Sequence, residues 1–145
     1  MKNMFIPFKR YGDFILDDDI AKYANILSAY KYEAPDEYGD EYYYSPDYKP
    51  YYTGHSLMVI DKKIRSVFCH KEVIYNNTNL INLSIDEFQN ITNSKYVDQP
   101  DEFDIFENEP PEYAYEFDDI GAQVWTHYGR VVTIIVSGYW SYEDD

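Results

Sequence analysis

Two segments of the chain decide the fold, and they share one pattern. Residues 54–69 read GHSLMVIDKKIRSVFC, and residues 121–136 read GAQVWTHYGRVVTIIV. In each segment two runs rich in β-branched and aromatic residues flank a short polar turn, which is typical of a β-hairpin. The expected strands are 56–60 with 64–69 in the first hairpin, and 122–126 with 131–137 in the second.

The two hairpins align without a gap when Gly54 is placed on Gly121. Lys62 then falls on Gly129 in the turn, and Cys69 falls on Val136 near the end of the second strand. A match spaced by 67 residues indicates two related halves rather than a solenoid. We expect the aromatic residues at 139–142 to extend the last strand.

Two helices are expected outside the hairpins. In residues 17–30 an apolar stripe with helical spacing follows Asp17-Asp18-Asp19, whose carboxylates suit a helix start. Ser84-Ile85-Asp86-Glu87 is a capping box, flanked by Leu83 and Phe88 in the positions of a hydrophobic staple. This second helix is expected to end near residue 91, before Thr92-Asn93-Ser94.

The remaining long stretches are unlike strands in composition, and we interpret them as loops inserted in the fold. Residues 31–52 contain eight tyrosines among three prolines, and residues 98–119 contain ten acids, three prolines and no Lys or Arg. The whole chain, 145 residues with 19% aromatic content, suits one folded domain. We therefore predict a single α+β domain over residues 1–145. It should have a mainly antiparallel sheet, two related β-hairpins and two to three helices.

The charge restricts the partners. The formal net charge is -15, from 27 Asp and Glu against 12 Lys and Arg, which argues against direct binding to nucleic acid or to anionic membranes. The N-terminal residues show no secretory signal, and no apolar run is long enough to span a membrane, so a cytoplasmic location is expected. Ten of the net charges come from residues 98–119. The charge is therefore a local feature, and its natural complement is a basic protein.

No catalytic or metal-binding pattern emerges. Cys69 and His70 are neighbours on a strand and point to opposite faces, so Cys69 is expected in the core. The histidines His55, His70 and His127 lack ligand spacing. The many carboxylates single out no catalytic pair, so we expect no enzyme, cofactor or metal.

Tyrosine and carboxylate side chains together suit contact with Lys and Arg, through ion pairs and cation–π interactions. The expected partner-binding residues are therefore acids of the 98–119 segment and, as a second choice, an acidic and tyrosine-rich run before the first hairpin. The first group is Asp101, Glu102, Asp104, Glu107, Glu109 and Glu112; the second is Asp40, Glu41, Tyr42, Tyr43 and Tyr44.

Three stretches resemble bacterial immunity proteins of contact-dependent inhibition and polymorphic toxin systems. They are residues 64–69, residues 79–88, and residues 117–125 with the following turn at 129–132, about a fifth of the chain. Among these families the stretches are similar to inhibitors of EndoU-type ribonuclease toxins. The shared motifs are turns, a cap and strands without a catalytic residue, and no contact residue transfers from the resemblance.

The resemblance implies an immunity protein that binds a cognate basic toxin, such as a nuclease, and occludes its active or substrate-binding surface. The alternative is an acidic nucleic-acid mimic that inhibits a DNA-binding defence protein. Both would use the same acids, but a mimic requires carboxylates spaced like the phosphates of a duplex.

Overall fold

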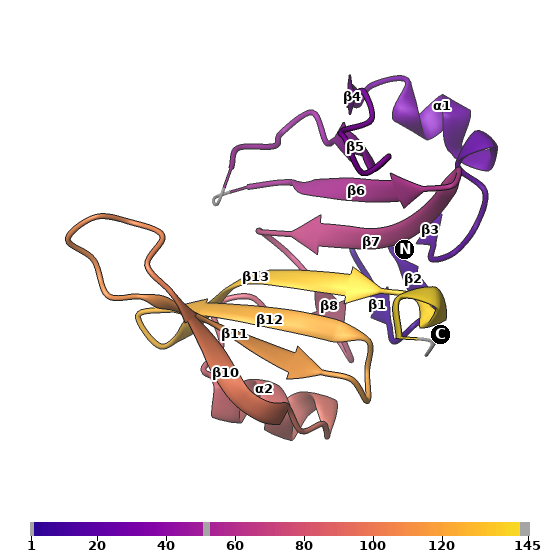
Figure 1. Ribbon diagram of the computed structural model, residues 1–145. Helices are drawn as coiled ribbons and strands as arrows, with labels where there is room; N and C mark the ends of the chain where they lie inside the picture. The colour runs from indigo at the N-terminus through magenta and orange to yellow at the C-terminus, as the bar shows by residue number, and fades with distance from the viewer. Residues whose placement is uncertain (1, 51–52, 143–145) are drawn as a thin grey trace.

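One eight-stranded antiparallel sheet forms most of the protein, which a computed structural model describes over residues 2–50 and 53–142 (Figure 1). The strands are β1 (Phe5–Ile6), β2 (Arg10–Tyr11), β3 (Phe14–Ile15), β4 (Lys31–Glu33), β5 (Glu41–Tyr44), β6 (His55–Ile60), β7 (Lys63–Cys69), β8 (Ile74–Tyr75), β9 (Thr78–Asn79), β10 (Val97–Phe103), β11 (Glu112–Phe117), β12 (Ala122–His127) and β13 (Arg130–Ser137). The helices are the 3₁₀ helices η1 (Ile20–Tyr23) and η2 (Tyr139–Tyr142) and the α-helices α1 (Ala24–Leu27) and α2 (Ile85–Thr92).

The large sheet consists of two meanders of four strands each. Its strand order is β10-β11-β12-β13-β7-β6-β5-β4, so consecutive strands pair within each half and β13 pairs with β7 in the middle. Both predicted hairpins are present, as β6–β7 and β12–β13. The fold is a single α+β domain, as the sequence predicted.

The central β7–β13 pairing relates the two halves by an approximate two-fold axis. Phe68 lies opposite Ile135, and the two residues occupy equivalent places in the two hairpins. On either side of this pair the contacts repeat: the Ser66 hydroxyl lies 2.7 Å from that of Ser137, and His70 Nδ1 lies 2.9 Å from the Thr133 hydroxyl. These structural equivalences support the prediction of two related halves.

The equivalence extends to the turns and to the segments before each helix. Both hairpins turn on two residues of positive φ, the type I′ pattern, and both pairings shift by one residue three positions before the turn. Near the start of the second strand of each hairpin, one residue makes the same pair of backbone hydrogen bonds to the segment before the helix. Ile64 exchanges backbone hydrogen bonds with Asp17 and Asp18, and Val131 does so with Asn82 and Leu83.

The core lies on one face of the large sheet. Alternate side chains of the central strands, including Leu57, Val67, Val124 and Ile134, are fully buried. They belong to one cluster with residues of β1–β3, η1, α1 and α2. The short strands β1–β3 lie behind the sheet in Figure 1. Cys69 is buried in this cluster, which confirms its predicted core position. We call this the covered face and the opposite one the open face.

The second helix matches its prediction closely. The Ser84 hydroxyl accepts a hydrogen bond from the Glu87 amide, and the Glu87 carboxylate accepts one from the Ser84 amide. The helix ends at Thr92, followed by Asn93 in the left-handed region at φ 52°. Phe88 is buried, with its ring 4.8 Å from that of Phe117.

The first helix is shorter than the predicted 17–30. It consists of η1 and α1, because Asp17 has a positive φ of 68° and is bonded to the first hairpin instead of entering a helix. The three aspartates have separate contacts. Asp17 pairs with Arg65 at 3.1 Å, Asp18 pairs with Lys22 at 2.9 Å, and Asp19 caps η1 through the Ala21 amide.

The loop interpretation of residues 31–52 and 98–119 was wrong. These segments contain β4, β5, β10 and β11, which extend both edges of the sheet, while Tyr51 and Tyr52 lie outside the described residues. Residues 139–142 do not extend β13 but form η2, where the Trp140 ring stacks 4.1 Å from the Arg65 guanidinium. Among residues 2–50 and 53–142, no helix is both long and apolar enough to cross a membrane.

The equivalent turn residues Lys62 and Gly129 give a matched test of the hairpin geometry. Lys62 has φ 64°, a conformation that disfavours residues with a Cβ, and Gly129 has φ 74°. We expect Lys62→Gly to stabilise the protein by up to about 1 kcal/mol and Gly129→Ala to destabilise it by about 1 kcal/mol. A Cβ at Gly129 would meet no atom within 4 Å, so its cost is conformational only.

Urea unfolding measures both free energies, in about 0.5 M NaCl to screen the lost lysine charge. Destabilisation by Lys62→Gly would show that the lysine side chain, rather than the turn conformation, matters at this position.

Candidate functional site

The acids of the first predicted group lie on one projecting hairpin. Asp101 and Glu102 are on β10, an edge strand, and Asp104, Glu107 and Glu109 are in the loop to β11; all five are exposed. This loop extends away from the sheet in Figure 1, at the left of the view. We call residues 97–117 the acidic hairpin. Because residues 96–129 contain no Lys or Arg, the hairpin supplies no cation of its own to neutralise these carboxylates.

Glu112 differs from the rest of its group. Only 4% of its surface is exposed, so it cannot offer a carboxylate to a partner as the sequence led us to expect. It lies at the start of β11 near His127, and burial raises the pKa of its carboxyl. Nothing in the sequence pattern indicates this burial, because Glu112 stands among exposed acids.

His127 holds the loop of the acidic hairpin against the sheet. Its Nε2–H donates to the Pro110 carbonyl at 3.1 Å, and the same nitrogen lies 3.6 Å from a Glu109 carboxylate oxygen. The Phe106 ring stands 5.6 Å from the imidazole. These contacts anchor the loop to the sheet, so its exposed acids lose less conformational entropy when a partner binds.

The second predicted group lies at the other end of the sheet and is divided between its two faces. Five strands lie between β5 and β10, which makes six inter-strand spacings of about 4.8 Å, or about 29 Å along the sheet, so these two strands do not bring their acids into one cluster. Tyr42 and Tyr44 point to the open face, whereas Tyr43 packs against the core on the covered face. Glu41 shares the face of Tyr43 and accepts a hydrogen bond from Tyr32 at 2.5 Å. Asp40 precedes the strand.

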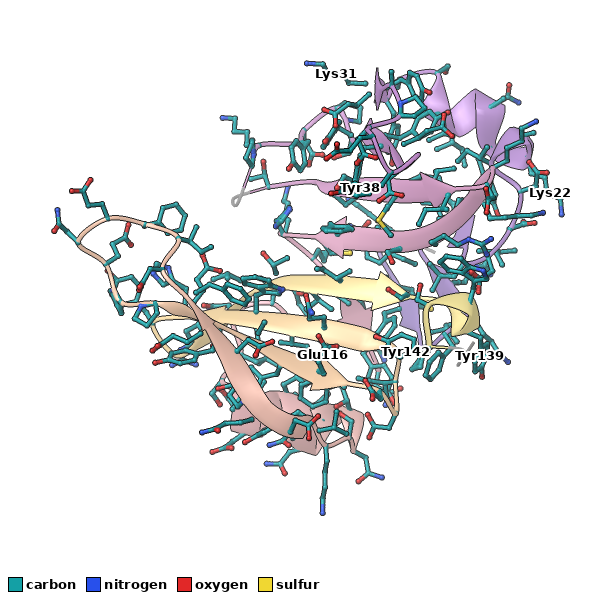
Figure 2. All side chains as sticks on the ribbon, viewed as in Figure 1. Lys22, Lys31, Tyr38, Glu116, Tyr139 and Tyr142 are labelled. Atoms are coloured by element: carbon teal, nitrogen blue, oxygen red, sulfur yellow. The ribbon has the colours of Figure 1, made fainter. Side chains whose placement is uncertain are left out.

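The open face connects the two groups with aromatic and apolar side chains that sequence reasoning missed. Figure 2 shows this face toward the viewer, with Glu116 among the labelled residues. The Tyr42 ring contacts Phe68 edge to face at 6.5 Å, and at the acidic end Phe103 stacks on Trp125 at 4.8 Å. Met58 and Ile135 are half-buried between them. Their alternation with buried neighbours along β6, β12 and β13 is the signal that could have revealed them.

Side-chain hydrogen bonds order the acidic half of this face. Trp125 Nε1 donates to the Gln123 side-chain oxygen at 2.7 Å, and the Gln123 amide in turn donates to Glu116. The chain of contacts fixes the indole ring and leaves one of its faces to Phe103. The open face therefore combines oriented aromatic rings with carboxylates at its rim, a composition suited to protein contact.

The titratable residues between the two groups are used in structural contacts. His70 bonds to Thr133, His55 bonds to Tyr30 at 2.6 Å, and burial lowers the pKa of both imidazoles. Burial raises the pKa of the Cys69 thiol, which disfavours a thiolate nucleophile. In the described part of the chain, no three His, Cys, Asp or Glu residues are grouped closely enough to hold a metal ion.

Comparison with known proteins gave no relative. No protein-family model matches the chain, and neither the curated proteins nor the solved structures include a significant match. The function is therefore argued from the acidic hairpin and the open face.

The buried Glu112 carboxyl makes stability depend on pH in a defined direction. Burial raises the pKa of Glu112 in the folded state above the pKa of about 4.5 that it has in the unfolded chain. The fold therefore loses stability as the pH rises from the pKa of the unfolded state through that of the folded state. We expect Glu112→Gln to raise the melting temperature at pH 7 and to have little effect at pH 4, where both side chains are neutral. Glu107→Gln makes the same charge change on the exposed loop and should leave the melting temperature unchanged. Equal effects of the two variants, or a loss with Glu112→Gln at pH 7, would contradict this account of Glu112.

Proposed function

We propose that this protein is an immunity protein that binds a basic protein toxin and neutralises it. The toxin is a nuclease, and the binding surface is the acidic hairpin with the adjoining open face. The main support is the hairpin itself, which carries six exposed carboxylates on an edge strand and an anchored, projecting loop, with no Lys or Arg in residues 96–129. They belong to Asp98, Asp101, Glu102, Asp104, Glu107 and Glu109. The resemblance of three stretches to immunity proteins points to the same role.

The proposed mechanism is occlusion without chemistry. A nuclease binds its substrate in a cationic cleft, and clustered carboxylates can occupy such a cleft in place of phosphates. Opposite fields also accelerate encounter, so an inhibitor can reach the toxin before the substrate does. The rigid rings of Phe103 and Trp125 would add apolar contact beside the ion pairs.

The proposal places the protein in the cytoplasm of the toxin-producing cell, where an internal nuclease would do harm. The natural test partner is the basic C-terminal domain of a toxin encoded by the adjacent gene. Co-expression should restore growth of cells that produce this domain, and the purified protein should abolish its nuclease activity at a molar ratio near one. Survival without complex formation, or a complex that leaves nuclease activity intact, would contradict the proposal.

The contribution of the acidic hairpin can be isolated with two variants of equal charge. The first combines Asp101→Asn, Asp104→Asn and Glu107→Gln; the control combines Asp13→Asn, Asp61→Asn and Asp86→Asn, which are exposed acids elsewhere. We expect the hairpin variant to associate with the toxin domain about 10- to 100-fold more slowly at low salt, and the control to change the rate only slightly. Stopped-flow fluorescence at several salt concentrations measures both rates. Equal slowing by the two variants would assign the effect to net charge and remove the hairpin from the interface.

A further inference from the structure

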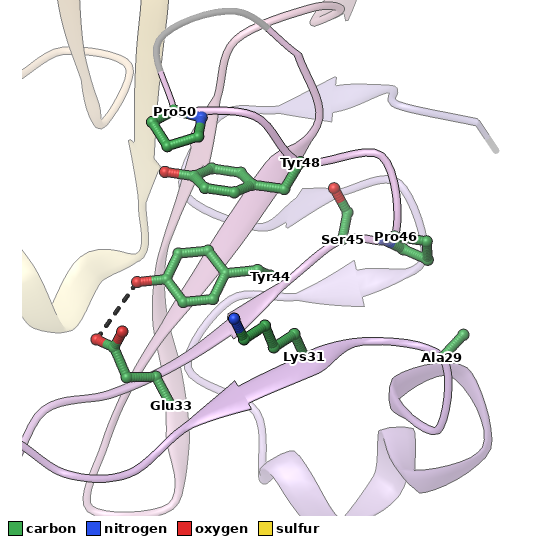
Figure 3. A pocket seen from close by; sticks show the side chains of 8 residues that line it. All are labelled: Ala29, Lys31, Glu33, Tyr44, Ser45, Pro46, Tyr48 and Pro50. Carbon is green, nitrogen blue, oxygen red and sulfur yellow. Dashed lines mark hydrogen bonds between the residues drawn. The ribbon is translucent and has the colours of Figure 1, made fainter.

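A cavity of about 730 Å³ opens at the end of the open face farthest from the acidic hairpin (Figure 3). It lies between β4, β5 and the chain that follows β5. The residues that line it are Ala29, Lys31, Glu33, Tyr44, Ser45, Pro46, Tyr48 and Pro50. The cavity is lined by two aromatic rings, two prolines and only two charged groups, so it is more apolar than the acidic hairpin.

Tyrosine rings form the aromatic wall of this cavity. The Tyr44 and Tyr48 rings are 4.7 Å apart and tilted by 48°, and the Tyr42 ring lies 6.3 Å from that of Tyr44, within 21° of parallel. Tyr48 is supported in turn by His70 at 5.8 Å. These neighbours hold the rings in place, so the part of the Tyr44 ring that lines the cavity can receive a planar group without reordering.

A carboxylate stands at the edge of the same ring. Glu33 accepts a hydrogen bond from the Tyr44 hydroxyl at 3.4 Å, and the two groups point toward each other in Figure 3. Burial, followed by the charge of Glu33, raises the pKa of Tyr44 to about 12, so the phenol stays neutral and keeps donating to the carboxylate. An electron-rich ring face beside a carboxylate is a combination that favours a cation.

We propose that this cavity receives an arginine side chain of the basic partner. The guanidinium would stack on the Tyr44 ring and donate to the Glu33 carboxylate. The inference rests on the proposed function, since it takes the partner to be a basic protein. It adds a second contact, on the strands at the opposite edge of the sheet from β10, that recognises a particular side chain rather than charge alone.

Arginine suits the site better than lysine or an anion. A guanidinium is planar, stacks on aromatic faces and offers paired donors to a carboxylate, whereas an ammonium is a compact, strongly hydrated charge. An anion would meet the Glu33 carboxylate and a protein of net charge -15. Lys31 is the one cation among the lining residues, and its removal should favour an arginine and disfavour an anion.

Deca-arginine and deca-lysine peptides serve as probes, with dissociation constants measured by calorimetry in about 0.15 M NaCl. We expect the unmodified protein to bind deca-arginine about 3- to 10-fold more tightly than deca-lysine. Tyr44→Leu combined with Tyr48→Leu should abolish this preference while leaving deca-lysine binding unchanged. Lys31→Met should tighten deca-arginine binding, and Tyr44→Phe, which keeps the ring, should retain most of the preference.

The outcomes separate this proposal from the proposed function. If the protein binds both peptides equally, or if the preference survives loss of the two tyrosines, the arginine site is overturned and the acidic interface stands. If Lys31→Met weakens deca-arginine binding, the cavity does not favour a cation and the proposal also fails. The triple hairpin variant described above should weaken both peptides equally and keep their ratio. If neither deca-arginine nor deca-lysine binds the unmodified protein or any of its variants, the proposed function is overturned as well.

Discussion

The pairing of β7 with β13 is the interaction on which the rest of the structure depends. It joins two four-stranded meanders edge to edge and buries Val67, Cys69, Ile134 and Val136 in one core. Without it, each meander would expose its most hydrophobic strand as an open edge, which is a site for aggregation. The two symmetric polar contacts beside the axis, Ser66 with Ser137 and His70 with Thr133, satisfy the hydroxyl groups of buried residues. The approximate symmetry thus follows from one shared strand pair.

The two halves differ where they reach the open face. Met58 and Trp125 are equivalent positions in the hairpins, and their neighbours in the next strand are Tyr42 and Ala114. Two residues farther along these strands, Tyr44 in the first half corresponds to Glu116 in the second. One half of the face is therefore rich in tyrosine and the other in carboxylates. In the proposed complex a partner would meet tyrosine rings at one end and carboxylates beside Phe103 and Trp125 at the other, and this difference would fix its orientation on the sheet.

The central half of the fold could be predicted from sequence because its signals are local. Alternating β-branched residues around a short turn define each hairpin, and the reciprocal hydrogen bonds of Ser84 and Glu87 define the start of α2. The edge strands could not be predicted in this way. β10 reads VDQPDEF, and nearly all of it is exposed, so neither apolar alternation nor composition marks it as a strand, although Pro100 is permitted at an edge. Composition located the charge on the acidic hairpin but could not show that Glu112 is buried or that Tyr43 faces the core.

The central claim is that the acidic hairpin and the open face form the contact surface, while the helices only support it. Amide hydrogen exchange, measured on the protein alone and in complex with the basic domain encoded by the adjacent gene, tests this directly. The account predicts slower exchange on binding in residues 97–112 and 41–44, with α2 unchanged. Protection confined to α2 and the short hairpins of the covered face, with residues 97–112 exchanging as in the free protein, would contradict it.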